Sequence, residues 1–221
     1  NRRLIEVFQE KTIDVMLMEG THFGFPDGNL ADEYKLEAEI TELVKDCKSI
    51  VLASFSPQHI DRLVAFIRAA KKTERTFIAD VYTAFIMHLL QNEIPLPQPE
   101  PAGLVRVYVP KALRESAHRS GKAKQIERFS DSEITMTEIC NHPEQFLMVF
   151  RASMLDDFGG QFPKGACCLF STWSGYMNQP EWKIAKGKID EVNGTLHEVH
   201  TSGHMRSADI VSFVKKLNPK A

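Results

Sequence analysis

Two polar segments, far apart in the sequence, carry side chains that together could do acid–base chemistry. Glu19 follows an apolar run at residues 13–18, and His204 closes the polar turn at residues 200–204. A carboxylate that hydrogen-bonds a histidine fixes its tautomer and makes a pair able to donate a proton. If both residues follow strands of one parallel sheet, they emerge at the same C-terminal edge, where open α/β sheets bind ligands. We therefore predict a dyad of Glu19 and His204.

Small hydroxyl side chains follow other predicted strands. Ser54 and Ser56 come at the end of an apolar run, with Arg62 shortly after, and Ser202 and Gly203 precede the last predicted helix. Hydroxyl groups beside the free N–H groups of helix N-termini can hold phosphate or carboxylate oxygens. The alternative is that these serines only cap their helices. An anion site is nevertheless predicted, because four such loops would meet at one edge: residues 19–22, 54–58, 171–176 and 201–204.

Familiar metal and cofactor motifs do not occur in the sequence. His197, Glu198 and His200 lack the spacing of a metalloprotease helix, and in a strand the two histidines point to opposite faces, so we expect no joint metal site. The four cysteines show no C-x-x-C spacing and are expected to be reduced core thiols. The sequence contains no G-x-G-x-x-G, no phosphate-binding P-loop and no G-x-S-x-G nucleophile elbow.

These loops need a scaffold, and the hydrophobic pattern predicts one. Apolar runs of strand length alternate with segments of helical spacing through most of the chain. The predicted strands are at residues 13–18, 49–55, 76–81, 104–109, 145–150, 165–170 and about 196–200, and the predicted helices are at about 33–47, 57–71, 82–91, 110–127, 135–140, 180–190 and 205–217. This order predicts an α/β fold with an open, mostly parallel sheet and helices on both faces.

Composition limits the function classes. The chain has 221 residues and a formal charge of −2, which argues against a globally basic nucleic-acid binder. One segment, residues 106–128, is locally basic, and a solvated helix face is the favoured interpretation of it. Apolar runs are too short for a membrane span, and the first residues lack a signal-peptide core, so we expect a cytoplasmic protein without membrane contact.

Three of these segments, taken in order, resemble a known family. They are Glu19-Gly20-Thr21-His22-Phe23-Gly24, then Leu52-Ala53-Ser54-Phe55-Ser56 with Asp61-Arg62, and finally Thr201-Ser202-Gly203-His204 before a helix that ends in Leu217-Asn218-Pro219-Lys220. Their order and separation resemble the β-CASP branch of the metallo-β-lactamase fold, which includes ribonuclease J and the endonuclease that cleaves pre-mRNA at its 3′ end. The likeness extends over nearly all of the chain.

The resemblance implies a zinc-dependent phosphodiester hydrolase that processes RNA. Two zinc ions would activate water in the whole enzyme. Glu19 and His204 would form the acid pair at the scissile phosphate, and the backbone of the substrate would be held by Ser54, Ser56, Arg62, Ser202 and Gly203. Single-stranded RNA is the implied substrate, with DNA as the alternative, and a homodimer stays open.

The family's zinc ligands come from an H-x-H-x-D-H motif and other histidines and an aspartate that have no match here. We therefore expect a piece of a longer protein, inactive and zinc-free by itself, whose partner is the missing metallo-β-lactamase domain of the same chain. The expected division is a strand of that domain at 1–28, a β-CASP domain at 29–192, and a returning strand and helix at 193–221.

Two other functions stay open. A non-catalytic module could bind RNA or another phosphate ligand through the same edge. A doubly wound hydrolase or transferase could instead act on a small molecule, although the lack of a nucleotide-binding loop argues against it.

Overall fold

The computed structural model describes residues 2–21, 23, 33–201 and 204–220. They form two compact units: a small one from residues 1–30 with 202–221, and a large one from residues 31–201. The strand expected to return to the first domain lies in the large unit, because Thr195–Glu198 pairs with the sheet there. The expected boundary at residue 192 and the observed division at residue 201 therefore differ.

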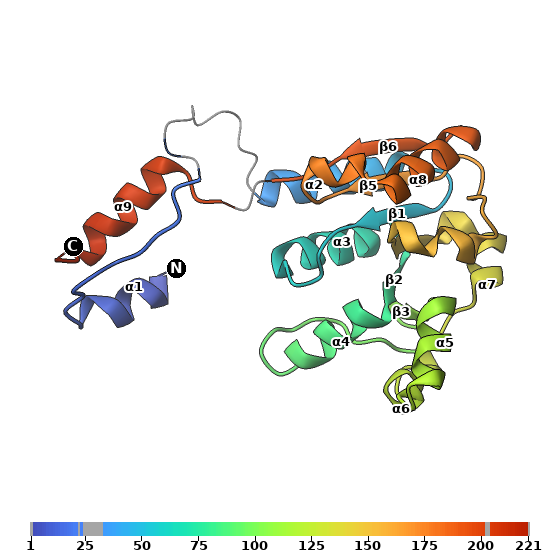
Figure 1. Cartoon of the computed structure of the whole chain (residues 1–221), viewed down its shortest axis with the longest axis horizontal. Coiled ribbons are helices and arrows are strands. Elements are labelled where there is room, and N and C mark those ends of the chain that lie inside the picture. The colour runs from blue at the N-terminus through green and yellow to red at the C-terminus, as the bar shows by residue number, and fades with distance from the viewer. Residues whose placement is uncertain (1, 22, 24–32, 202–203, 221) are drawn as a thin grey trace. The chain divides into compact units, whose positions relative to one another are not determined.

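The large unit is built on six parallel strands in the order β3-β2-β4-β1-β5-β6 (Figure 1). This confirms the predicted α/β class with an open parallel sheet. The central strand β1 is buried at every residue, which explains its continuous apolar sequence. The strands are β1 (Val51–Ser54), β2 (Thr76–Asp80), β3 (Val105–Tyr108), β4 (Phe146–Val149), β5 (Cys167–Phe170) and β6 (Thr195–Glu198).

Alternate strand residues pack into two separate cores, one on each face of the sheet. One face is covered by α2 (Glu33–Asp46), α3 (Ile60–Lys72), α4 (Val81–Leu90), α5 (Lys111–Arg119) and α6 (Ala123–Glu127). The other is covered by α7 (Met136–Asn141), the 3-10 helix η3 (Ala152–Phe158) and α8 (Pro180–Glu191). Three short 3-10 turns lie between these elements: η1 (Ser130–Ser132), η2 (Pro143–Gln145) and η4 (Ser174–Asn178).

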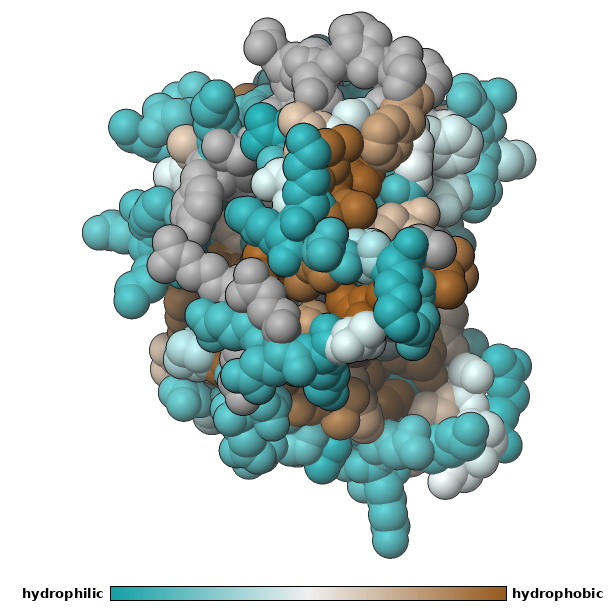
Figure 2. Space-filling model, turned by 90° about the vertical axis from the view of Figure 1, so that its left-hand side faces the viewer, coloured by the Kyte–Doolittle hydropathy of each residue, from teal (hydrophilic) through white to brown (hydrophobic). Residues whose placement is uncertain are grey.

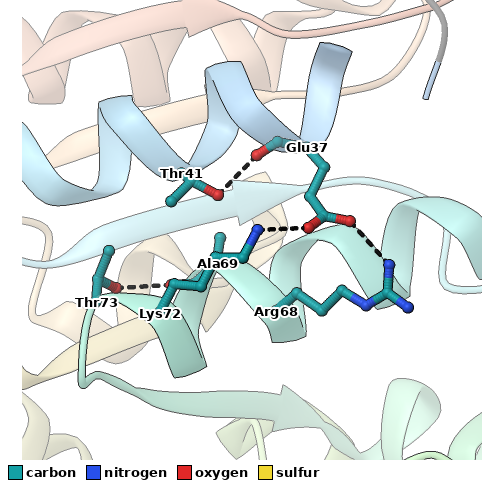
Figure 3. A network of polar contacts seen from close by, with 6 residues as sticks. All are labelled: Glu37, Thr41, Arg68, Ala69, Lys72 and Thr73. Carbon is teal, nitrogen blue, oxygen red and sulfur yellow. Dashed lines mark hydrogen bonds and ion pairs between the residues drawn. The ribbon is translucent and has the colours of Figure 1, made fainter. Parts of the chain in front are cut away.

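Ion pairs join α2 to α3 on the outside of the first face (Figure 3). The carboxylate of Glu37 accepts from Arg68 at 3.0 Å and from Lys72 at 2.7 Å. Burial raises the pKa of this carboxyl, but the two cations outweigh it and leave the pKa below its usual value. The side chains of Arg68 and Lys72 are exposed, so these ion pairs orient α2 and contribute little to stability.

Two local predictions were wrong. The helix expected at 110–127 is broken into α5 and α6, because Gly121 lies between them with a left-handed φ of 67°. The helix expected to begin at Ser56 and Pro57 begins at Ile60, and His59 is its N-cap. Ser56 instead accepts a turn hydrogen bond from the His59 N–H through its carbonyl, at 3.0 Å.

In the small unit, α1 (Arg2–Gln9) packs against α9 (Ser207–Leu217). The carbonyl of Ile13 accepts from the Lys220 N–H at 3.0 Å, and Asp14 forms an ion pair with the Lys220 side chain at 2.7 Å. The strand expected at residues 13–18 is absent from this described segment. No described residue of the small unit forms a strand that could pair with it, and a lone strand has no ladder to satisfy its backbone.

Part of this apolar run is exposed. Val15 is 65% exposed and Leu17 is 93% exposed, so neither side chain contributes much to a core. Figure 2 shows hydrophobic surface among hydrophilic side chains on one face of the molecule.

None of the helices in the described part of the chain has the length and apolar character to cross a membrane.

Candidate functional site

A crevice opens at the C-terminal edge of the sheet, within the large unit. The chain leaves β1 toward α3 on one face, but leaves β4 and β5 toward η3 and α8 on the other face. Neighbouring strands whose connections diverge in this way leave a crevice that α/β proteins use for ligands. Here it is a cavity of about 350 Å³, lined by Ser54, Phe55, Ser56, Pro57, Tyr82, Arg151, Ala152, Ser153, Thr172, Tyr176, Gln179, Glu181 and Trp182.

Arg151 lies two residues after the end of β4 and lines this crevice with its positively charged side chain. Its Nε donates to Asp80 Oδ2 at 2.6 Å, while Asp80 Oδ1 accepts from the Thr83 N–H at 2.8 Å. Asp80 therefore caps α4 and anchors Arg151 at the same time. The guanidinium lies over the ring of Tyr82, 5.6 Å from its centroid.

The anchored arginine keeps hydrogen-bonding capacity. Its side chain is 39% exposed, and its buried Nη2 atom has no hydrogen-bond partner among the described residues. A buried donor without a partner costs about 1–3 kcal/mol, so an oxygen acceptor that reached it would be favoured. A phosphate or carboxylate offers several such oxygens and the complementary charge.

Ser54 and Ser56, two of the predicted binding residues, both line this crevice. Ser54 is buried with 8% exposure, whereas Ser56 is exposed. Thr172, from the loop after β5, lines the same cavity. On the other side of the opening, the Tyr82 hydroxyl accepts from Gln58 Nε2 at 2.8 Å.

Arg62 does not face the crevice as expected. Its side chain is 1% exposed, and its guanidinium donates to the Ser171 hydroxyl, to Val199 O at 3.2 Å and to Thr201 Oγ1 at 3.0 Å. These oxygens belong to the loops after β5 and β6, so Arg62 ties those loops to α3. The expectation that it contacts a substrate is corrected to a structural role, because its donors are directed to the chain itself.

Glu19 and His204 lie together in the small unit, as predicted, although not by way of a shared sheet. Glu19 Oε2 is 3.0 Å from His204 Nδ1, and Glu19 Oε1 accepts from the Met205 N–H at 2.8 Å. Hydrogen bonds from the Thr21 side chain and the Met205 backbone lower the pKa of Glu19 to about 2, with a smaller contribution from His204. Glu19 is therefore ionised at neutral pH and can hold the Nδ1 proton of His204.

Ser202 and Gly203, the remaining predicted binding residues, lie outside the described residues. Within the described ranges, no three histidine, cysteine or acidic side chains lie close enough together to hold a metal ion. We derive no step through the zinc ions expected for the whole enzyme. The four cysteines are free, with Cys167 and Cys168 buried, but Cys140 is exposed, so describing all four as core thiols was wrong.

The sequence analysis missed Tyr82 and Arg151, which line the crevice, and Asp80, which anchors Arg151. Asp80 and Arg151 could have been found, because each is a polar residue that directly follows an apolar run of strand length, as in the loops that were predicted. Asp80 is the first polar residue after the apolar part of β2, and Arg151 directly follows the run that ends at Phe150. Comparisons with protein-family models and with curated proteins found no match to this sequence.

Proposed function

We propose that this chain supplies the substrate-binding region and a carboxylate–histidine pair of a phosphodiester hydrolase of the ribonuclease J type. The proposal places the protein in the cytoplasm and gives it single-stranded RNA as substrate, with DNA as the alternative. Its support from sequence is the resemblance of three separated segments to the β-CASP branch. Its main support from geometry is the contact of Glu19 with His204 and with Met205, which lies 186 residues after Glu19 in the sequence.

In this proposal the two polar sites have different tasks. Glu19 accepts a hydrogen bond from the Nδ1–H group of His204 and so leaves the Nε2 atom as the ring nitrogen that exchanges a proton with a phosphate or leaving oxygen. Arg151, Ser54 and Ser56 bind backbone phosphates of the substrate in the crevice of the large unit.

The experiment is turnover of a labelled single-stranded RNA by the natural full-length protein with added Zn²⁺ or Mn²⁺. We expect His204→Ala to lower kcat by about 10²- to 10⁴-fold, the usual contribution of a general acid or base, while RNA affinity changes little. His142→Ala, which alters an exposed histidine in a turn of the large unit, is the matched control and should keep full activity. Unchanged turnover of the His204 variant would remove the pair from the mechanism.

The second candidate is a non-catalytic module that binds RNA or another phosphate ligand. The crevice around Arg151 favours it, because the cavity lies wholly within the large unit and its anchored cation needs no metal. Zinc content of the purified full-length protein separates the two functions. A hydrolase should contain stoichiometric zinc and cleave RNA, whereas a module should bind RNA in a salt-dependent manner without either property.

A further inference from the structure

Helix α4 presents two aromatic side chains one turn apart, Tyr82 and Phe85, at a spacing that places them on one face. Tyr82 is 43% exposed, and Phe85 is partly buried. An arginine lies against each ring: the Arg151 guanidinium is 5.6 Å from the centroid of Tyr82, and that of Arg128 is 5.3 Å from the centroid of Phe85. These two neighbouring arginine–aromatic pairs, one around exposed Tyr82 and one around partly buried Phe85, form a surface on which planar bases can stack.

A hollow lies beside these rings, between α4 and the pair α5 and α6. Its volume is about 420 Å³, and Phe85, Leu113 and Ile126 form much of its apolar wall. Lys122 and Gln125 stand at its polar side. A hollow of this kind offers an apolar contact for one or two bases and a cation for a phosphate next to them.

The charge around the hollow favours a polyanion over an apolar peptide. Residues 111–128 contain six arginines and lysines and two glutamates, a local charge of +4, although the whole chain has a charge of −2. Arg114 is ion-paired with Glu133, whereas Lys111, Arg119, Lys122 and Lys124 are exposed. Aromatic side chains set among exposed cations are the usual means of holding a single strand without reading its sequence.

Tyr82 connects this hollow to the crevice, since it lines both cavities. We propose that the hollow between α4 and α6 is a second nucleotide subsite, which takes bases of a single strand whose phosphate is bound at Arg151. The strand then runs across Tyr82, with Phe85 and Lys122 holding the next nucleotides. This inference rests on the proposed function, because it extends the same binding surface.

The test is fluorescence anisotropy of the full-length protein with labelled 2′-O-methyl oligouridylates of 4 and 12 nucleotides, at low salt and without added metal. Loss of a stacked base by alanine substitution typically corresponds to about 5- to 100-fold in affinity, so Phe85→Ala should weaken binding of the 12-mer within that range. Lys122→Glu should weaken it several-fold. Binding of the 4-mer, which we expect to engage mainly the crevice side of Tyr82, should change less than about twofold.

Two matched controls belong to this experiment. Leu89→Ala removes an exposed apolar side chain from the same helix, and Lys186→Glu makes the same charge change on α8, on the other face of the sheet. Both should bind the 12-mer normally. Because Phe85 packs edge-on against Phe129, Phe85→Leu serves as a second variant that keeps apolar bulk but removes the ring.

The outcomes separate this inference from the proposed function. If Arg151→Met weakens the 12-mer but Phe85→Leu and Lys122→Glu do not, the second subsite is wrong and the crevice stands. If the unaltered protein binds neither oligonucleotide, the proposed function and the subsite both fail. Equal losses in Lys122→Glu and Lys186→Glu would show a general charge effect and would also overturn the subsite.

Discussion

The crevice of the large unit and the Glu19–His204 pair of the small unit hold polar groups in different ways. In the large unit, Arg62 is 1% exposed and donates to loop oxygens, and Asp80, which anchors Arg151 of the crevice, is 4% exposed and bonded on both oxygens. In the small unit, the side chains of His204 and Glu19 are 47% and 34% exposed. The first arrangement is part of the folded core, while the second depends on a few hydrogen bonds at the surface.

This difference has a consequence for substitutions. A buried polar network carries both position and stability, because each partner left unsatisfied incurs its full desolvation cost. An exposed pair can be altered with little effect on folding, since water replaces the missing partner. Variants of the buried polar network should therefore lose stability, whereas variants of the Glu19–His204 pair should keep it. Measuring stability and ligand binding on the same variants shows this difference.

The largest effect is expected for Arg62. Arg62→Ala should lower the free energy of unfolding by about 3 kcal/mol or more, because it removes the buried guanidinium that donates to oxygens of Ser171, Val199 and Thr201. Urea denaturation followed by circular dichroism measures the change. Arg119→Ala, on the exposed surface of α5, is the control and should stay within about 0.5 kcal/mol. A decrease in the free energy of unfolding of less than about 1 kcal/mol for Arg62→Ala would contradict the structural role of Arg62.

A smaller effect is expected at Asp80, where two interactions can be separated. Asp80→Ala removes the cap of α4 and the anchor of Arg151, and should cost about 2 kcal/mol in unfolding free energy. Asp80→Asn keeps an oxygen for the cap but loses the charge, so it should cost about half as much. Both variants should weaken RNA binding alike. Equal stability losses for the two would show that the cap does not matter.

Arg151 should affect both folding and binding. Arg151→Met should lower the free energy of unfolding by about 1–2 kcal/mol, because the buried Asp80 carboxylate loses its ion pair, and should lower RNA affinity by about tenfold and reduce the salt slope by about 1. Anisotropy titrations at several salt concentrations measure both quantities. Unchanged affinity together with an unchanged slope would exclude Arg151 as a phosphate contact.

The smallest effect concerns the titration of Glu19. Its pKa of about 2 in the folded chain lies below the ordinary value of 4.5, so its ionised form stabilises the fold above about pH 4.5, and this contribution is lost as the pH falls toward 2. NMR titration of the side-chain carboxyl should show a midpoint near 2. Thr21→Val should raise this midpoint more than His204→Ala, because Thr21 is the larger cause. A midpoint near 4.5 in the unaltered protein would contradict the arrangement.

Much of the large unit could be predicted from the sequence. Continuous apolar runs such as residues 49–55 are typical of strands buried on both faces of a parallel sheet, and the segments of helical spacing between them favoured the α/β class. The apolar run at residues 13–18 has the same appearance but forms no strand, because a strand needs a neighbour to pair with and the local sequence does not specify one. The contact between Glu19 and His204 was predicted correctly. The predicted reason was wrong, because Glu19 does not follow a strand of the sheet.

The sequence by itself determined the class of fold, the order of its elements and the types of polar residues that follow the strands. Only the tertiary structure decided which of those residues are available to a ligand. Arg62 and Arg151 both follow buried strands by a short distance, yet one donates to neighbouring loops and the other, anchored by Asp80, lines the cavity. The physical reason is that burial and hydrogen-bond partners of a long side chain depend on which loops the strand order brings together, and that order is not written in the local pattern.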